Sequence, residues 1–253
     1  MFRPTPRKER LVRIALISDV HSNLVALEAV LADAEERGAE AIWNLGDTVG
    51  YGPDPNGVVA RVVEAGAVSV LGNHDAAATG AIGTEWFNSL AAEAAEWTRA
   101  HVEPETAATL AGLGEVVREG EWSLAHGTLR QPLWEYLITE EAAEGHFALQ
   151  ETPYSAVGHT HVPLLVRRGT AGVEGETPVP GETVAFGEGL LCVNPGSVGQ
   201  PRDGDPRSSY ALVDTETGTV THQRVPYDIG ETQRRMEEAG LPRGLAERLG
   251  YGR

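Results

Sequence analysis

The chain has 253 residues, of which 41% are hydrophobic, and this suits one large globular domain or two small ones, with a sizeable core. No apolar run approaches the roughly 18 residues that a membrane span needs, so the sequence predicts no membrane partner. The formal net charge of −17 repels nucleic-acid backbones, which argues against a long nucleic acid as the ligand.

The N-terminal segment and the single cysteine indicate how the chain is organised. Residues 1–10 are basic, contain two prolines and lack the apolar centre of a secretory signal, so we expect a flexible arm before a single domain over residues 11–253. Cys192 is the only cysteine, which excludes an internal disulfide and a thiolate metal cluster. This cysteine usage favours a cytoplasmic protein.

The first third of the chain alternates between apolar runs and helical spacing. We predict strands over residues 11–17, 41–45 and 67–71, because each run is apolar and rich in β-branched residues. Apolar residues recur at helical spacing from Leu24 until Gly38, and a second helix ends near Glu64. This strand–helix alternation predicts an α/β sheet with parallel neighbours.

The rest of the chain mixes both kinds of element. Residues 79–112 predict two helices broken near Pro104, and residues 139–149 and the tail from residue 230 predict further helices. Strands are expected at 116–117, 122–125, 154–157, 162–167 and 190–193, and residues 209–213 and 219–225 form a hairpin. Residues 168–188 are rich in Gly, Pro and Glu, which favours a loop or weak hairpin.

Polar side chains follow these predicted strands where each strand ends. They are Asp19, His21, Asp47, Asn73, His74, His126, His159 and His161. Ligands of open α/β sheets bind beyond the carboxyl ends of the strands, so we expect these side chains to converge. Because they offer oxygen and nitrogen but no sulfur, they favour manganese, iron, zinc or similar divalent ions.

Seven of the eight side chains form a sensible ligand set for two ions. One ion would take Asp19, His21 and His161, the other would take Asn73, His126 and His159, and Asp47 could bridge both. Two such ions lie about 3.5–4 Å apart and share a water or hydroxide. Two divalent ions contribute a charge of +4, and two carboxylates and a hydroxide contribute −3. The net charge of the centre is then about +1, which would draw a phosphate into an acidic protein.

The same segments resemble the calcineurin-like metallophosphoesterase family. They are Asp19-Val20-His21, Gly46-Asp47, Gly72-Asn73-His74-Asp75, His126 and Gly158-His159-Thr160-His161, in order within residues 13–213. The resemblance implies an α/β (α+β) fold, a four-layer α-β-β-α sandwich with two mixed sheets. It also implies a dinuclear centre with the ligand division given above. His74 would act as the catalytic acid or electrostatic helper at the phosphoester.

Two further segments resemble the small bacterial and archaeal phosphodiesterase branch. They are Ser18-Asp19-Val20-His21-Ser22-Asn23 and Asn194-Pro195-Gly196-Ser197, the latter expected as a tight turn that braces the site. Gly50-Tyr51-Gly52 stands where the protein phosphatase branch carries Asp-Arg-Gly, so that branch's phosphate-gripping arginine is not implied. Many small phosphodiesterases of this kind have Cys at the position of His74. The histidine in this chain keeps monoester hydrolysis open as an alternative.

The sequence therefore predicts a metal-dependent phosphoesterase for a small substrate, with phosphodiesters favoured. The alternatives are a phosphomonoesterase or nucleoside-polyphosphate hydrolase, and a non-catalytic protein-binding scaffold such as the retromer subunit of this family. The presence of all seven ligands favours the enzyme. Asn73, His74 and Arg130 are the predicted substrate contacts, and an oligomer is compatible with the sequence. His101, His146 and His222 match no motif and are expected to be structural.

Overall fold

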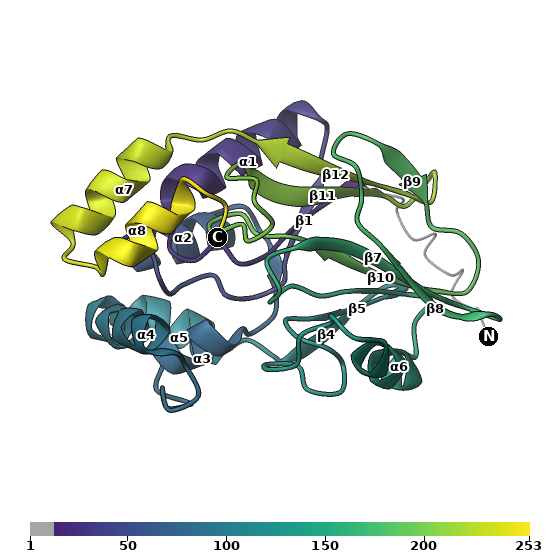
Figure 1. Ribbon diagram of the computed structural model, residues 1–253, viewed down its shortest axis with the longest axis horizontal. Helices are drawn as coiled ribbons and strands as arrows, with labels where there is room; N and C mark the ends of the chain where they lie inside the picture. The colour runs from purple at the N-terminus through teal and green to yellow at the C-terminus, as the bar shows by residue number, and fades with distance from the viewer. Residues whose placement is uncertain (1–12) are drawn as a thin grey trace, which may run out of the picture.

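Two six-stranded mixed sheets lie face to face in the computed structural model, which describes residues 13–253 (Figure 1). The predicted arm over residues 1–10, and the first two residues of the first predicted strand, lie outside the described residues. Within residues 13–253, no helix combines the length and the apolar character needed to cross a membrane.

Each sheet combines parallel and antiparallel neighbours. Sheet A has the order β3 (Val68–Ser69), β2 (Ala41–Asn44), β1 (Arg13–Ile17), β11 (Ser208–Asp214), β12 (Thr219–Val225), β9 (Thr183–Ala185). Sheet B has the order β4 (Val116–Glu119), β5 (Trp122–Ala125), β6 (Tyr154–Ala156), β10 (Leu190–Pro195), β7 (Pro163–Gly169), β8 (Gly172–Glu176). Strands β1, β2 and β3 are mutually parallel, as are β5, β6 and β10. Parallel strands end at the same edge, so the loops after them gather there.

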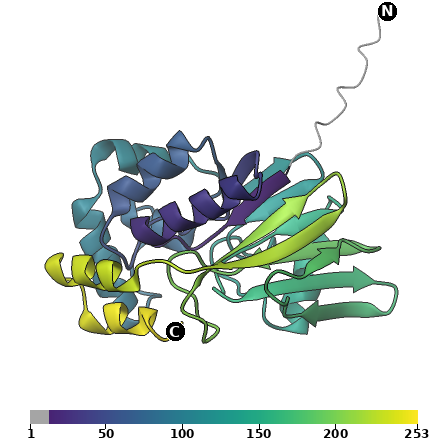
Figure 2. The same cartoon turned by 90° about the horizontal axis from the view of Figure 1, so that it is seen from above.

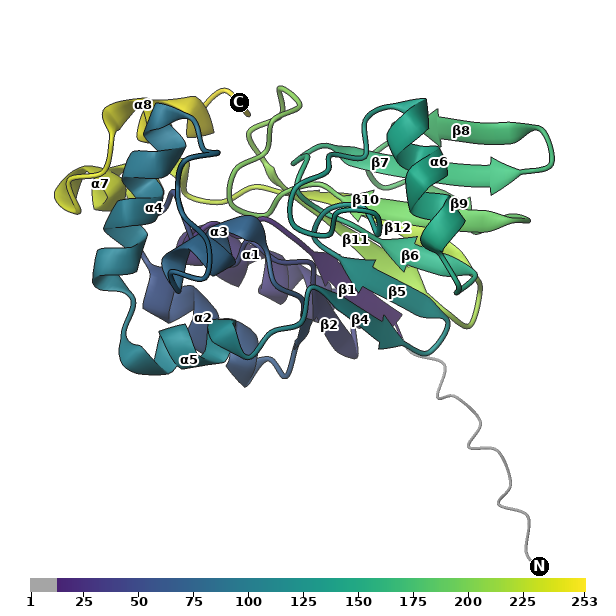
Figure 3. The ribbon, with the colours of Figure 1, turned by 90° about the horizontal axis from the view of Figure 1, so that it is seen from below.

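Helices cover the outer face of both sheets and complete the four layers. α1 (Leu24–Glu36) and α2 (Pro55–Glu64) share a core with sheet A, and α1 lies along that sheet in Figure 2. α6 (Glu140–Leu149) packs on sheet B, as Figure 3 shows. The central core fills the space between the sheets, where the rings of Trp43 and Trp122 lie 5.8 Å apart. The predicted four-layer sandwich is confirmed.

The remaining helices gather beyond one end of the sheets, on the left of Figure 1. They are α3 (Asn73–Ala78), α4 (Ser89–His101), α5 (Pro104–Ala111), α7 (Ile229–Glu238) and α8 (Arg243–Leu249). The sequence did not indicate α3. This helix begins inside the Gly72–Asp75 tetrapeptide because the Asp75 carboxylate accepts hydrogen bonds from the backbone N–H groups of Gly72 and Val49.

Residues 168–188, for which a loop or weak hairpin is expected, contain the turn of the β7–β8 hairpin and a further short strand, β9. β8 pairs with β7 and extends sheet B, whereas β9 pairs with β12 and extends sheet A. The two short strands therefore belong to different sheets, and the chain crosses from one sheet to the other between them. Edge strands tolerate this polar, Gly-rich composition because one side of each strand has no sheet partner.

Candidate metal centre

All seven predicted ligands lie together beyond the carboxyl ends of the parallel strands. Sheet A supplies four of them and sheet B three, and every one is buried: Asp19, His21, Asp47, Asn73, His126, His159 and His161. Their ligand atoms form two neighbouring groups that could each hold a metal ion, Asp19 with His21 and His161, and Asp47 with His126 and His159. The two sheets thus bring together residues far apart in the sequence.

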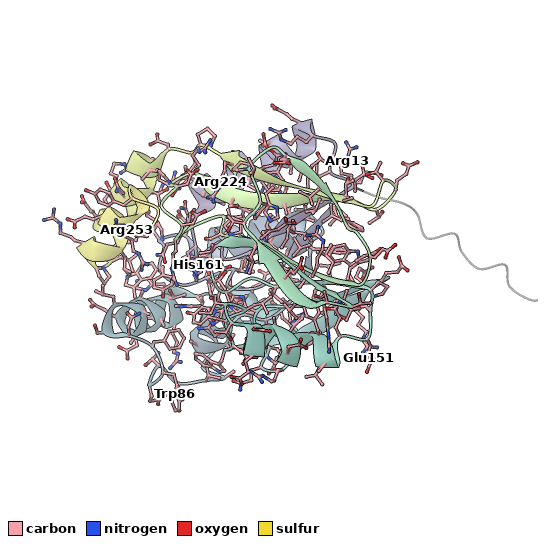
Figure 4. The ribbon with its side chains drawn as sticks, turned by 45° about the vertical axis from the view of Figure 1, so that its right-hand side comes forward. Arg13, Trp86, Glu151, His161, Arg224 and Arg253 are labelled. Carbon is pink, nitrogen blue, oxygen red and sulfur yellow. The ribbon has the colours of Figure 1, made fainter. Side chains whose placement is uncertain are left out.

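The first group joins the loop after β1 to the loop after β6. The Nε2 atoms of His21 and His161 are 3.2 Å apart. His161 Nε2 lies 3.3 Å from Asp19 Oδ1, and that oxygen has no hydrogen-bond partner among the described residues. His161 is buried, and Figure 4 labels it near the middle of the view. Three ligand atoms therefore surround one small buried space.

The second group lies next to the first. His126 Nε2 is 3.0 Å from His159 Nδ1, 3.2 Å from Asn73 Oδ1 and 3.3 Å from Asp47 Oδ2. The same Asp47 oxygen lies 3.7 Å from Nε2 of His21, which belongs to the first group. Asp47 is accordingly the residue that contacts both groups.

Backbone carbonyl groups determine which nitrogen of each histidine is free to bind a metal. The contacts are His21 Nδ1 to Val49 O at 3.1 Å, His161 Nδ1 to Gln200 O at 2.6 Å, His126 Nδ1 to Leu45 O at 2.8 Å and His159 Nε2 to Trp134 O at 3.2 Å. A carbonyl oxygen only accepts, so these nitrogens carry the proton in the neutral ring. The remaining nitrogen lone pairs face each other within each group and repel unless a cation or a proton lies between them. This donor set fits divalent ions.

Burial and charge shift the titration of the ligands. Burial, reinforced by the Asp47 carboxylate, raises the pKa of Asp19 to about 7. Burial alone would lower the pKa of His126, but the carboxylates of Asp47 and Asp19 and the carbonyl of Leu45 together raise that pKa to about 9. Burial, together with the charge of His126, lowers the pKa of His159 to about 3. Protons thus neutralise part of this buried charge, and a metal ion would displace them.

The ligand loops adopt strained backbone conformations. Five ligands have φ between 48° and 67°: Asp19, His21, Asp47, His159 and His161. Positive φ is uncommon outside glycine and is maintained only where the surrounding structure demands it. Gly72 is required for a related reason, since a Cβ there would overlap Oδ1 and the backbone nitrogen of Asp47. The close approach of the loops after β2 and β3 depends on this glycine.

The end of β10 and the residues that follow it brace these loops, as expected for the segment Asn194-Pro195-Gly196-Ser197. Asn194 Nδ2 donates to the carbonyl of Gly158 at 2.8 Å and to Oγ1 of Thr160 at 3.0 Å. Ser197 Oγ donates to the carbonyl of Asp19 at 2.8 Å. One short segment therefore supports the ligand loops of both sheets.

A cavity of about 170 Å³ opens onto the second group and His161. It is lined by Asp47, Tyr51, Asn73, His74, Trp86, Phe87, Asn88, Ala91, Trp134, Tyr136, His159, His161 and Arg202. Four of these side chains are ligand candidates, five are rings of Tyr, Phe or Trp, and one is a permanent cation. The cavity is therefore large enough for more than a water molecule and reaches both ligand groups.

Comparison with known proteins identifies the family. The calcineurin-like phosphoesterase superfamily domain matches residues 12–218, which is most of the chain. The chain belongs to the calcineurin-like phosphoesterase superfamily. This phosphoesterase is therefore a hydrolase acting on ester bonds, of a metal-dependent family.

Relatives from archaea and bacteria match over most of their length. An uncharacterised protein of Methanocaldococcus jannaschii is 35% identical over 246 residues, covering 95% of this chain and 98% of that protein. Phosphodiesterase YfcE of Escherichia coli is 25% identical over 224 residues, which cover 83% of this chain and 91% of that protein. The crystal structure of a metallophosphoesterase from Sphaerobacter thermophilus superimposes with a TM-score of 0.88 at 44% identity, covering 96% and 100% of the two chains. The shared fold extends over nearly the whole phosphoesterase.

His74 stands beside the ligand groups of the phosphoesterase without joining either one. Its side chain lines the cavity, and its Nδ1 atom is buried with no hydrogen-bond partner among residues 13–253. The ring contacts Tyr51 and Phe87 at centroid distances of 4.4 and 4.7 Å. This position agrees with the sequence-based expectation, while the catalytic role of His74 stays a prediction.

Arg130, the arginine predicted to contact substrate, lies outside the residues that line the cavity. Its guanidinium is paired with Glu135 at 2.5 Å and Glu141 at 3.5 Å. Its position therefore gives no support to a role in substrate binding.

Arg202 occupies the place that was expected for Arg130, and sequence reasoning missed it. Its Cζ lies 5.7 Å from the centroid of the Tyr51 ring, its Nη2 donates to Gln200 Oε1 at 2.9 Å, and its Nε is buried without a hydrogen-bond partner among the described residues. The signal that could have found it is its place after the end of β10, where the other parallel strands carry their ligands.

Proposed function

We propose that this phosphoesterase hydrolyses small phosphodiesters at two divalent metal ions, such as manganese, iron or zinc. One ion would be held by Asp19, His21 and His161, the other by Asn73, His126 and His159, with Asp47 bridging them. The observation that carries the proposal is the pair of buried groups in which two histidine nitrogens, neither contacting a backbone carbonyl, converge at 3.0–3.2 Å beside an open cavity. The likeness to a phosphodiesterase named YfcE supports the choice of ester.

The residues of the cavity divide the chemistry among them. Bound divalent ions would supply Lewis-acid charge at the phosphoryl oxygens and an activated water. Arg202 offers guanidinium N–H groups to a phosphoryl oxygen, and its planar fork suits that geometry. His74 offers a ring N–H to the departing oxygen, where general acid catalysis is typically worth about 10²–10⁴-fold. The backbone N–H of His74 donates to Asp47 Oδ1 at 2.8 Å and orients that carboxylate.

The charge of the cavity favours a diester over a monoester. Arg202 is the single arginine or lysine among the described lining residues, in a chain of net charge −17. A diester carries one negative charge near pH 7, whereas a monoester carries nearly two and needs more compensation. A monoesterase is the second candidate, because His74 can assist departure of a poor leaving group.

A direct test compares two nitrophenyl substrates on protein loaded with manganese. We expect bis-p-nitrophenyl phosphate to show a kcat/KM at least about tenfold above that of p-nitrophenyl phosphate, and elemental analysis to find about two ions per chain. A preference for the monoester would select the second candidate. A folded, loaded sample with almost no metal would contradict the metal centre itself.

The Asp47→Asn variant tests the bridge within the same experiment. The substitution keeps the shape of the side chain but removes its charge, so we expect loss of at least one ion and of nearly all activity in a folded protein. Asp214→Asn is the matched control, because Asp214 pairs with Arg13 at the surface. Wild-type turnover of Asp47→Asn would show that Asp47 does not bridge the ions.

The cellular setting is part of the proposal. Cys192 is fully buried, and burial raises the pKa of its thiol to about 12, so the thiol is unreactive. A chain whose single cysteine is inert gains nothing from an oxidising compartment, and we propose a cytoplasmic location.

A further inference from the structure

Aromatic side chains from two separate loops form one wall of the cavity. Trp86 and Phe87 come from the loop between α3 and α4, while Trp134 and Tyr136 come from the loop between β5 and α6. The rings of Phe87 and Trp134 meet edge to face at 5.7 Å and join the two loops. We call these four residues the aromatic wall. None of their side chains belongs to the two candidate metal groups.

The aromatic wall continues from the metal groups to the surface. Tyr136 stacks on the ligand candidate His159 at 4.1 Å with an interplanar angle of 7°. At the outer end, Trp86 leaves 84% of its surface exposed, and Figure 4 shows it at the lower edge of the molecule, whereas His161 is buried. An exposed tryptophan at the mouth of a cavity marks a place where a flat apolar group can be bound.

The chemistry of the cavity therefore has two parts. The metal groups and Arg202 suit the phosphoryl group of a substrate, and the aromatic wall suits a planar ring on one of its ester arms. Bases stack on aromatic side chains through their π-faces, whichever base they are. The net charge of −17 repels a long polyanion, so the ligand is a small molecule rather than a strand of nucleic acid.

We propose that the substrate is a nucleotide ester, a phosphodiester with one nucleoside arm whose base stacks on the aromatic wall at Trp86. This inference rests on the proposed phosphodiesterase function and specifies its substrate class. The phosphoryl group lies at the metal groups beside Arg202, and the second ester arm is the one that departs. A base on the aromatic wall extends from the reacting phosphorus toward the mouth of the cavity.

The test uses two diesters with the same leaving group. Thymidine 5′-(p-nitrophenyl phosphate) and methyl p-nitrophenyl phosphate both release nitrophenolate, so they differ only in the arm that remains. For manganese-loaded wild-type protein we expect the nucleoside ester to have a kcat/KM at least about tenfold higher, since stacking of one base is worth about 5–150-fold. Trp86→Ala should lower this ratio at least about fivefold, and Trp86→Phe should retain most of it.

Tyr251→Ala is the matched control, because Tyr251 is an aromatic residue with 68% of its surface exposed that does not line the cavity. We expect it to leave the ratio of the two substrates unchanged. A binding measurement gives a second readout that is independent of turnover. By calorimetry, thymidine 5′-monophosphate should bind the loaded protein at least about tenfold more tightly than methyl phosphate, and Trp86→Ala should remove the difference.

The outcomes separate the two proposals. If the wild-type protein hydrolyses neither diester, the proposed phosphodiesterase function fails. If it hydrolyses both with equal kcat/KM, or binds both monophosphates equally, the nucleotide proposal is overturned while the phosphodiesterase stands. Phenyl p-nitrophenyl phosphate is a third substrate, and a phenyl arm that gains as much as the nucleoside arm would also overturn the assignment of a nucleobase.

Discussion

Each histidine of the candidate metal centre is oriented by a carbonyl group outside the ligand set. The four carbonyls belong to Leu45, Val49, Trp134 and Gln200. Such partners select the tautomer and hold the ring so that the other nitrogen faces the ion. The side chain alone therefore does not make a ligand, because an imidazole free to rotate would spend most of its time in other orientations.

At the residue scale, we expect substitutions of Arg202 and Arg130 to have different effects on substrate binding. Arg202→Ala removes the cation of the cavity, so we expect KM for a phosphodiester to rise at least about tenfold with both ions retained, as for the loss of a charge-assisted hydrogen bond. Arg130→Ala breaks a surface ion pair with Glu135 and should change KM less than about twofold. Steady-state kinetics with metal analysis checks both, and a larger effect at Arg130 would reverse the assignment.

His74 is predicted to act on the leaving group. Burial lowers the pKa of His74 to about 4, and a bound anionic phosphoryl group acts in the opposite direction. We expect His74→Ala to keep both ions, to lose little rate on a nitrophenyl diester and to lose about 10²–10⁴-fold on an alkyl ester, whose alkoxide needs a proton. Equal losses on both esters would point to electrostatic stabilisation, and loss of metal would make His74 a ligand or structural residue.

At the scale of elements, helix α6 secures the loop that follows β5. His146 of this helix is fully buried, accepts a hydrogen bond from the backbone N–H of Leu129 at 3.1 Å, and donates through Nε2 to Ser155 Oγ at 2.8 Å. The first contact holds the loop that begins at His126, and the second reaches strand β6. The expected structural role of His146 is therefore to connect a helix, a strand and a ligand loop.

The buried His146 makes stability depend on pH. Burial lowers its pKa from 6.5 to about 4, so between these values the unfolded chain binds more protons than the folded one. The free energy of unfolding therefore falls as pH falls from 6.5 toward 4, and His146 accounts for about 2 kcal/mol of that loss by pH 5.

Denaturant unfolding at pH 7.5 and pH 5 measures this contribution. His146→Asn should lose about 2 kcal/mol less stability between the two pH values than the wild-type protein, because it removes the titrating group. His101→Asn is the matched control, since His101 is an exposed histidine stacked on Trp97, and should keep the wild-type difference. If His146→Asn loses as much stability between the two pH values as the wild-type protein, then the pKa of His146 is not lowered in the folded protein.

At the scale of the whole molecule, the candidate metal centre connects the two sheets. The loops of sheet A carry Asp19, His21, Asp47 and Asn73, and those of sheet B carry His126, His159 and His161. Each group in turn combines residues of both sheets. Bound ions would therefore stabilise the stacking of the sheets as well as the ligand loops, and they would offset the repulsion of buried carboxylates in an acidic chain.

Removal of metal should lower the thermal stability of the whole domain. An ion present at about 1,000 times its dissociation constant contributes about 4 kcal/mol, which corresponds to a rise in Tm of about 10 °C for a chain of this size. We expect calorimetry to show this rise when manganese is added to chelator-treated protein, and Asp47→Asn to show a smaller one. An equal rise in both proteins would place the stabilising ion elsewhere.

Local pattern was enough to predict most helices and strands, the seven ligand candidates and, through the resemblance of five short motifs, the family and the four layers. These features can be predicted because an apolar run indicates a buried strand and the polar residue after it indicates where the strand ends. Both signals lie in one short segment of the sequence. Tertiary structure placed β8 and β9 in different sheets. The sequence of a short polar strand does not indicate its partner, because the pairing depends on contacts with residues distant in the sequence. The same holds for the positions of Arg202 and the exposed Trp86 at the cavity and of Arg130 outside it. Contacts distant in the sequence determine which charges and cavities surround an arginine or a tryptophan, so these positions follow only from the folded chain.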